Sequence, residues 1–302
     1  MGRAQRATGV AGAIALACAG LAGPAAAAGG SSPSAGTITV TTPATGAFTL
    51  SSNNHRAGQV RFHFVSKAPA SMNGGGSDVT LIGLRNGVSL TAVENHIRAQ
   101  QGPPPGAAAS TQWLNANVRV YGGAAIQGLG TADVVAFLPA GTVYLVDVNS
   151  IFSGAKVVNA KAFHVYGSVA RSLLPPIAGT ISVTSADRFQ VTSTQLPRGR
   201  YLIRNIADTI HFVDFAPVKP GTTDADITKV ANAEMMGKPP ASDPYLHNKT
   251  GVESDVLSAG QQQVFSSPLL TPGTYDLECF IADDMTGIPH FFMGMHKIIV
   301  IK

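Results

Sequence analysis

The stretch Leu270–Lys302, LTPGTYDLECFIADDMTGIPHFFMGMHKIIVIK, is the most informative part of this chain of 302 residues. A Pro-Gly-Thr-Tyr turn opens a strand that ends at Cys279, and a loop leads from there to His290. Four more residues separate His290 from Met295, and the chain closes with the apolar strand Ile298–Ile301. The pattern predicts two neighbouring strands joined by a loop that carries chemically active side chains.

The side chains of Cys279, His290 and Met295 offer a thiolate, an imidazole and a thioether. A soft thiolate and thioether combined with an imidazole suit copper better than a hard cation such as magnesium. We therefore treat these three residues as candidate ligands of one copper ion. No other segment of the sequence has comparable chemical content.

The overall composition favours short strands and turns over long helices. Only 13% of residues are charged, while the chain holds 33 glycines and 19 prolines. The length is sufficient for two domains. The net charge is +4, and the basic residues are scattered without interleaved aromatics, so we expect no nucleic-acid partner.

Residues 1–28 have the pattern of a secretory signal peptide. Arg3 and Arg6 form a positive start, Val10–Leu21 is apolar, and Ala26–Ala28 offers a small-residue cleavage site. The apolar run is too short for a stable membrane span. We expect a bacterial protein that is exported and then secreted, periplasmic or otherwise part of the cell envelope.

Residues 29–35 read as a flexible lead-in to the first strand. Cleavage before them removes Cys18 and leaves Cys279 as the single cysteine of the mature chain. In an oxidising compartment an unpaired cysteine is buried and inert, reactive, or bound to a metal. The sequence leaves these alternatives open.

The chain contains two similar series of strands. In the order first series and second series, the matching segments are Gly36–Val40 and Gly179–Val183, Phe48–Leu50 and Phe189–Val191, Val60–Phe64 and Arg200–Arg204, and Leu138–Tyr144 and Leu270–Tyr275. The repetition predicts two β-sandwich units, 36–174 and 175–302.

Each unit also contains a predicted short helix and a softer insert. Residues that favour helix N-termini place the helices at Ser89–Arg98 and Asp224–Ala233. The inserts, Gln101–Ser110 and Gly237–Gly251, are rich in proline and polar residues. We expect both inserts to be exposed.

The last strands resemble those of bacterial exported members of the cupredoxin superfamily, including plastocyanin-like copper-binding proteins. The matching residues are Pro272, Gly273, Thr274, Tyr275, Cys279, Phe280, Ile281, Pro289, His290, Gly294 and Met295. The resemblance implies an all-β fold of two tandem Greek-key cupredoxin-like β-sandwiches. It also implies a fourth ligand, a histidine that begins an earlier strand.

His211 matches that fourth position, because it follows a strand and a turn that contains Asn205. The full candidate set is therefore His211, Cys279, His290 and Met295. When the two units are aligned, Ser77 matches His211, and Asp147 matches Cys279. We expect the first unit to be a degenerate cupredoxin-like domain without metal ligands.

The sequence departs from the small blue copper proteins in one respect. Ten residues separate Cys279 from His290, where those proteins have only a few. This longer loop could return His290 to the sulfur or leave it several ångströms away, and Met293 and His296 could substitute as ligands. If no copper binds, Cys279 is a buried small hydrophobic residue in a metal-free cupredoxin fold.

The resemblance implies one-electron transfer to a partner redox protein, with His290, Phe291 and Phe292 as the electron port. Copper storage or delivery is an alternative use of the same site. A different class is a metal-free binding or scaffold module of the cell envelope. The chain has no His-x-His pair and no hydrolase, metalloprotease or phosphate-loop motif, so we expect no enzymatic activity. The oligomeric state is not indicated by the sequence.

Overall fold

The computed structural model describes most of the chain after the predicted signal peptide and lead-in. The described stretches are 36–70, 75–153, 159–169 and 173–302. The predicted signal peptide, 1–28, and the lead-in, 29–35, lie outside the described residues. Within the described stretches, every helix is too short or too polar to cross a membrane.

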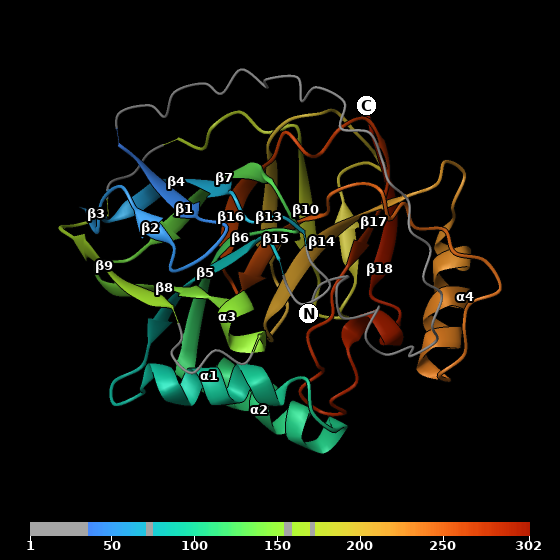
Figure 1. Cartoon of the computed structure of the whole chain (residues 1–302), viewed down its shortest axis with the longest axis horizontal. Helices are drawn as coiled ribbons and strands as arrows, with labels where there is room; N and C mark the ends of the chain where they lie inside the picture. The colour runs from blue at the N-terminus through green and yellow to red at the C-terminus, as the bar shows by residue number, and fades with distance from the viewer. Residues whose placement is uncertain (1–35, 71–74, 154–158, 170–172) are drawn as a thin grey trace.

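The described strands form two large sheets (Figure 1). The eight-stranded sheet contains, from edge to edge, β11 (Phe189–Val191), β10 (Gly179–Val183), β13 (Tyr201–Asn205), β16 (Gln262–Ser266), β7 (Gly130–Leu138), β4 (Gly58–Ser66), β1 (Thr37–Thr42) and β2 (Thr49–Leu50). The ten-stranded sheet contains β12 (Gln195–Leu196), β18 (His296–Ile301), β17 (Gly273–Glu278), β14 (His211–Val218), β15 (Val252–Leu257), β6 (Val118–Ile126), β5 (Ser77–Leu84), β8 (Gly141–Asp147), β9 (Ala160–Tyr166) and β3 (Asn54–Arg56).

Each sheet is built half from the first series of strands and half from the second. Read inwards from its two edges, the eight-stranded sheet runs β2-β1-β4-β7 and β11-β10-β13-β16, so matching strands hold matching places. The ten-stranded sheet has the same arrangement: read inwards from its two edges, it runs β3-β9-β8-β5-β6 and β12-β18-β17-β14-β15. The all-β fold with two units in tandem is therefore as expected.

The two units are not separate sandwiches, which the sequence did not predict. β7 pairs antiparallel with β16, and β6 pairs antiparallel with β15, so both sheets run continuously from one unit into the other. This arrangement covers the central edge of each half-sheet, because each supplies the hydrogen-bond partner that the other lacks. One apolar core cluster accordingly includes residues of both units.

Buried and partly exposed side chains alternate along several strands, as the alternating apolar residues of their sequences predict. Along β1 and β10 every second side chain is buried, as expected for strands with one face on a core. β14 differs because all eight of its residues are buried. A strand covered on both faces is a rigid support for the residue at its start, His211.

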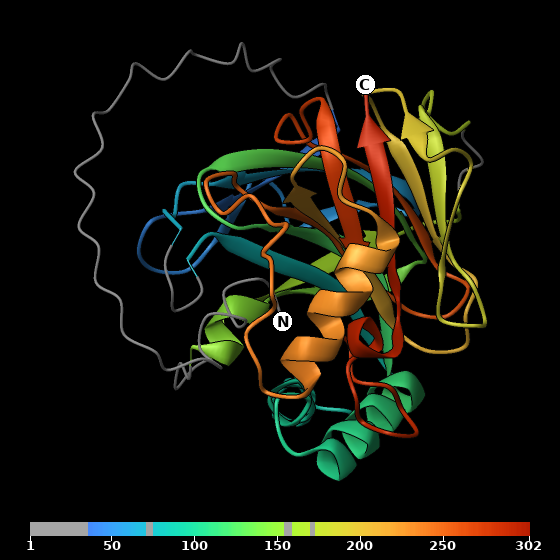
Figure 2. The ribbon, with the colours of Figure 1, turned by 90° about the vertical axis from the view of Figure 1, so that its right-hand side faces the viewer.

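Four α-helices lie outside the sheets in the described part of the chain, and Figures 1 and 2 show them around the sandwich. They are α1 (Leu90–Ala99), α2 (Pro104–Asn117), α3 (Val148–Phe152) and α4 (Asp224–Met235). The two predicted helices are confirmed as α1 and α4. Ser89 caps α1 by accepting from the Ala92 amide at 3.1 Å, and Thr223 and Asp226 form a capping box on α4.

The prediction that Gln101–Ser110 is exposed is confirmed for most of its residues, although most of the stretch is helical. From Pro104 onward it is the first half of α2, in which Ala107, Ala108 and Ser110 are buried. Proline is favoured in the first helical turn because its missing N–H has no intrahelical partner there, and the small alanines then allow close packing.

The second insert, Gly237–Gly251, is only partly exposed. Tyr245 within it is buried, forms an isolated bridge with Val218, and donates its hydroxyl to the Glu278 carboxylate at 2.7 Å. This stretch is therefore tied to the end of β14 by the bridge and to the end of β17 by the tyrosine hydroxyl.

Candidate metal centre

The turn before His211 is fixed by the side chain of Asn205. Its amide nitrogen donates to the carbonyl oxygens of Thr209 at 2.7 Å and Leu257 at 2.8 Å, while its oxygen accepts from the Ala207 amide at 3.0 Å. Both N–H groups and the oxygen of this buried amide are thus hydrogen-bonded, and they tie the turn to the end of β15. The first residue of β14, His211, is placed accordingly.

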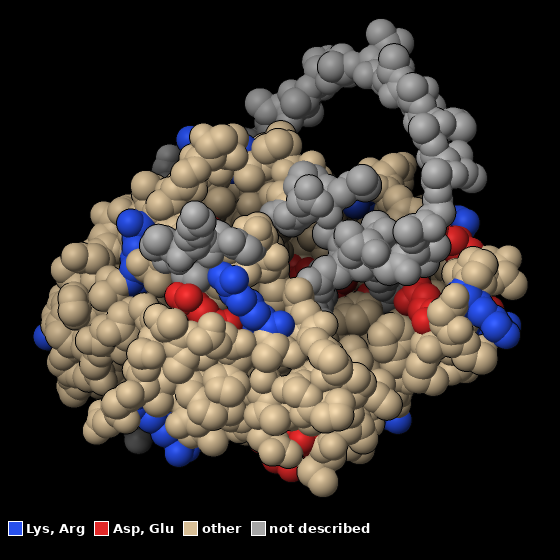
Figure 3. Space-filling model, turned by 60° about the horizontal axis from the view of Figure 1, so that its bottom comes forward, with Lys and Arg blue, Asp and Glu red and all other residues tan. Residues whose placement is uncertain are grey.

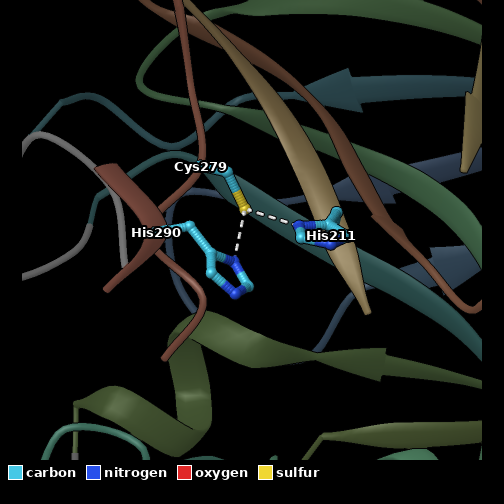
Figure 4. A group of neighbouring side chains, drawn as sticks. All are labelled: His211, Cys279 and His290. Carbon is cyan, nitrogen blue, oxygen red and sulfur yellow. Dashed lines mark hydrogen bonds between the residues drawn. The ribbon is translucent and has the colours of Figure 1, made fainter. Parts of the chain in front are cut away.

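Three predicted ligands meet in the interior (Figure 4). The Sγ of Cys279, directly after β17, lies 3.6 Å from Nδ1 of His211 and 3.8 Å from Nδ1 of His290. All three side chains are buried. One ligand atom from each lies within 4.8 Å of the others, which is close enough for them to share one metal ion.

The long loop returns His290 to the sulfur because its two ends pair with each other. The amide of Phe291 donates to the Cys279 carbonyl at 2.7 Å, and the amide of His290 donates to the Ile281 carbonyl at 2.9 Å. The ten residues Phe280–Pro289 therefore form a hairpin-like excursion whose base is closed. The open question of the loop length is settled by these backbone hydrogen bonds.

The tip of the loop is ordered around Asp283. Its Oδ1 accepts from the Met285 amide at 3.1 Å and from both the amide and the hydroxyl of Thr286, at 2.6 and 2.7 Å. The Asp283 amide donates to the Ile288 carbonyl at 2.9 Å. An aspartate that binds its own turn in this way stabilises it without a larger core.

Cys279 and His211 shift each other's protonation. Burial alone would raise the pKa of the Cys279 thiol, but hydrogen bonds and charge from the two imidazoles lower it from 9.0 to about 6. Burial alone would lower the pKa of His211, but Asp187 and Cys279 raise it from 6.5 to about 9. At neutral pH the metal-free pair is a thiolate beside an imidazolium, so the sulfur is already in the form that binds metals.

Two carboxylates lie on the far side of the imidazoles from the sulfur. Asp187 Oδ1 is 3.1 Å from Nε2 of His211, and Asp283 Oδ2 is 3.9 Å from Nε2 of His290. A carboxylate at the second ring nitrogen can orient a histidine and increase its strength as a ligand, and at 3.1 Å Asp187 is placed to act in this way on His211. The 3.9 Å between Asp283 and His290 is too long for a hydrogen bond. Sequence reasoning missed Asp187, which stands in a turn at φ 51° and has no motif that marks it.

Met295, the fourth predicted ligand, is fully buried and follows Gly294, the C-cap of the short helix η2 (His290–Met293). Its amide donates to the His290 carbonyl at 2.9 Å, which ties it to the ligand loop. Its role as a ligand remains a prediction. His296, considered as a substitute, instead contacts Thr228 of α4, with 3.0 Å between Nε2 and Oγ1.

The equivalent positions of the first unit have a different chemistry. Ser77, at the start of β5, shares a buried hydrogen bond of 2.7 Å with Thr42. Asp147, at the end of β8, accepts from the Ser150 amide at 3.3 Å and caps α3. Within the described residues, the groups able to hold a metal lie in the second unit alone.

The first imidazole begins a strand, the cysteine follows the penultimate strand, and the second imidazole lies in the last loop. All three are held by neighbouring antiparallel strands of the ten-stranded sheet, β14, β17 and β18, and the eight-stranded sheet forms the other layer. The fold is cupredoxin-like. Two imidazole nitrogens and a thiolate, all buried and within 4.8 Å of one another, fit a copper ion by ligand type.

No protein-family model and no curated protein matches the chain. Solved structures similar to it include auracyanin B, at 17% identity over 44% of this chain and 93% of that chain, with a TM-score of 0.25. Another is auracyanin A, described as a "blue" copper protein from Chloroflexus aurantiacus, at 18% identity over 41% of this chain and 96% of that chain, with a TM-score of 0.24.

A third similar solved structure is the Cu-containing nitrite reductase from Thermus scotoductus, at 11% identity over 88% of this chain and 67% of that chain, with a TM-score of 0.22. Scores of this size carry no argument. The assignment of the fold rests on the strand order, the pairing and the placement of the three side chains.

The predicted electron port needs correction. His290 and Phe291 are fully buried, because Phe291 packs against Phe280 with ring centroids 4.8 Å apart, and Phe292 is only partly exposed. The exposed apolar side chains of this region are Met285, at 80% exposure, and Met293, at 38%. An imidazole edge open to solvent is therefore not a feature of this site.

Proposed function

We propose that this protein binds one copper ion through His211, Cys279 and His290, with Met295 as a weak fourth ligand, and transfers single electrons. The observation that carries the proposal is the buried group of one sulfur and two imidazole nitrogens, with Sγ–Nδ1 distances of 3.6 and 3.8 Å. Burying such a group lowers the stability of the fold unless its polar atoms find partners, and a bound metal ion is one such partner.

A bound copper ion would supply the change between two oxidation states. The protein would contribute a fixed set of donors. His211 is held by the Asn205 turn and Asp187, and His290 by the closed base of its loop. Because burial excludes water and the donors are positioned before the metal arrives, little rearrangement accompanies gain or loss of an electron.

We propose that a redox partner docks on the face formed by Met285 and Met293. Both side chains belong to the loop and short helix that carry His290, and Thr286 Oγ1 lies 3.7 Å from the Met293 sulfur. Burial and the charges of Asp283, Asp208 and Asp187 raise the pKa of Asp284 in the same loop, and this gathering of carboxylates favours a partner with a basic rim. Figure 3 shows, on the visible part of the molecule's lower face, charged groups scattered among uncharged ones.

Export is part of the proposal and rests on the signal-like pattern of residues 1–28. An oxidising compartment would leave a solitary cysteine exposed to oxidation unless it were buried or bound to metal. Cys279 is buried, which is compatible with such a location.

The test is the visible spectrum of the mature chain, 29–302, titrated with Cu(II), beside Cys279→Ala. Copper–thiolate bonding should give an intense visible band at one equivalent, absent from the variant. Cys279→Ser, which keeps the size of the side chain, is the control for packing.

Absence of a band, together with no copper retained after gel filtration, would overturn the proposal. The metal-free binding module would then be the better account of the fold. A band whose copper exchanges rapidly with a chelator would point to storage or delivery instead of electron transfer.

A further inference from the structure

Helix α2 of the first unit contacts both segments that carry the candidate ligands of the second unit. In Figures 1 and 2 the loop between β17 and β18, drawn in red, reaches down to α2, drawn in green. The contacts come from residues 111, 112 and 115 of the helix, of which residue 115 lies about one turn after the other two. No ligand comes from this unit, so its role at the site has to be indirect.

Asn115 contacts the turn before His211. Its side-chain oxygen accepts from the amide of Ile210 at 3.1 Å, and its nitrogen donates to the Thr209 hydroxyl at 2.6 Å. The same nitrogen lies 3.4 Å from the Asp284 carboxylate in the ligand loop. One amide group thus joins the residue directly before the first imidazole to the loop that leads to the second.

Two neighbours strengthen the contact with the loop. The Thr111 hydroxyl donates to the Ala282 carbonyl at 2.8 Å, and Gln112 Nε2 donates to the Asp284 carbonyl at 2.6 Å. Thr111 is itself fixed, because Gln100 Nε2 donates to its oxygen at 2.9 Å. The loop backbone is therefore hydrogen-bonded to α2 at two carbonyls, which would otherwise need water.

The start of α2 also fits the loop tip closely. A Cβ added to Gly287 would lie 1.8 Å from the Pro104 carbonyl oxygen, and Gly287 has a φ of 72°. Glycine is required at this point for both reasons. The approach of backbone to backbone shows that the loop tip and the helix are fitted to each other.

We propose that α2 is a clamp, defined by Thr111, Gln112 and Asn115, that fixes the spacing between His211 and the Cys279–His290 loop. Asn115 is the positioning residue that joins the two sides. The ten-residue loop is longer than a tight turn, and the clamp supplies the restraint that a short loop has by itself. This inference deepens the proposed function, since it assumes that the spacing serves a metal.

The experiment compares Asn115→Ala and Gln112→Ala with Asn117→Ala. Asn117 is the matched control, because it lies on the same helix and its side-chain nitrogen donates only to the Trp113 carbonyl, at 2.9 Å, among the hydrogen bonds of the described residues. Gln112 is exposed, so its variant should fold even if Asn115→Ala does not.

The first measurement uses metal-free protein and the rate at which a small alkylating reagent modifies Cys279 at one fixed pH. Loss of the Asn115 contacts should raise this rate about tenfold through more frequent local opening, and loss of Gln112 should raise it about threefold. Asn117→Ala should match the parent chain. Thermal midpoints recorded in parallel separate general destabilisation from an effect on the site.

The second measurement is the Cu(II) spectrum and its electron paramagnetic resonance. Asn115→Ala should shift the band and broaden the resonance, whereas Asn117→Ala should reproduce the parent signature. Alkylation rates and spectra of Asn115→Ala and Gln112→Ala equal to those of Asn117→Ala would overturn the clamp. If the parent chain binds no copper, the proposed function fails, and the alkylation rates still decide whether α2 holds the loop.

Discussion

The two units present the same strand ends with opposite chemistry. Where β14 begins with His211, β5 begins with Ser77, and where Cys279 follows β17, β8 ends with Asp147. In the first unit these positions are satisfied locally, by Thr42 and by the capping of α3. In the second unit the Cys279 sulfur lies 3.6 Å from Nδ1 of His211, and the loop adds the imidazole of His290 at 3.8 Å from the same sulfur. The shared arrangement of strands is therefore not sufficient for a metal site, which also needs His211, Cys279 and the loop that carries His290.

The largest effect is expected when Cys279 of the second unit is replaced by aspartate, the residue at the matching position 147 of the first unit. Cys279→Asp should abolish the copper–thiolate band and weaken Cu(II) binding by more than about a hundredfold, since even groups that only orient a ligand cost ten- to a hundredfold when lost. Titration followed by absorption and calorimetry measures both.

The matched control is Asp147→Cys in the Cys279→Asp background, which places the only thiol of the mature chain in the first unit, beside no imidazole at position 77. It should give no band at one equivalent of copper. A band from that variant would mean that the scaffold alone can create the site.

His211→Ser copies Ser77 and should separate the cysteine from its main partner. The pKa of Cys279, about 6 with both imidazoles present, should rise toward 9.0, because burial then opposes the charge with only His290 in favour. Thiolate absorption of metal-free protein at pH 7.5 should fall accordingly. Unchanged absorption would show that His290 alone sustains the thiolate.

Copper affinity should depend on pH in a way that only the second unit can produce. Between pH of about 6 and about 9 the metal-free Cys279–His211 pair holds one proton that a metal must displace, and below about 6 it holds two. Affinity should therefore rise about tenfold per pH unit within that window and more steeply below it. Competition titrations with a chelator at several pH values measure the slope, and a flat profile would contradict the ion pair.

The smallest effect is expected in the first unit. Ser77→Ala leaves the buried Thr42 hydroxyl without its partner and should lower the free energy of unfolding by about 1–2 kcal/mol. Copper spectra should not change. The exposed Ser185→Ala should stay within about 0.5 kcal/mol of the parent in denaturant unfolding. A change of the copper spectrum in Ser77→Ala would show that the two units are coupled at this end.

The sequence was a good guide wherever the chemistry is local. Ser89 and Thr223 mark helix starts through side-chain capping, and both predicted helices are present. Asp283, a residue type that favours turns, accepts from the Thr286 amide and stabilises the turn of the ligand loop. These features depend on residues a few positions apart, so the residue types alone carry the signal.

The sequence was a poor guide wherever partners are distant. The stretch Gln101–Ser110 contains proline and small residues that suit a loop as well as a helix, and Pro104 within it lies against Gly287 of a loop far along the chain. Asp187 has no motif, because its role comes from contact with His211.

The sequence by itself determined the all-β class, the repeated order of strands and the identity of His211, Cys279 and His290 as a candidate set. The first two follow from periodicity and repetition, and the donor chemistry of Cys279 and His290 is present in the chain in any conformation, whereas His211 was singled out by the resemblance to cupredoxins. Only the tertiary structure decided that both sheets run through the two units, that the long loop brings His290 to 3.8 Å from the sulfur, and that α2 packs on that loop. Each of these depends on backbone hydrogen bonds and close contacts between segments far apart in the chain, and such contacts exist only once the chain has folded.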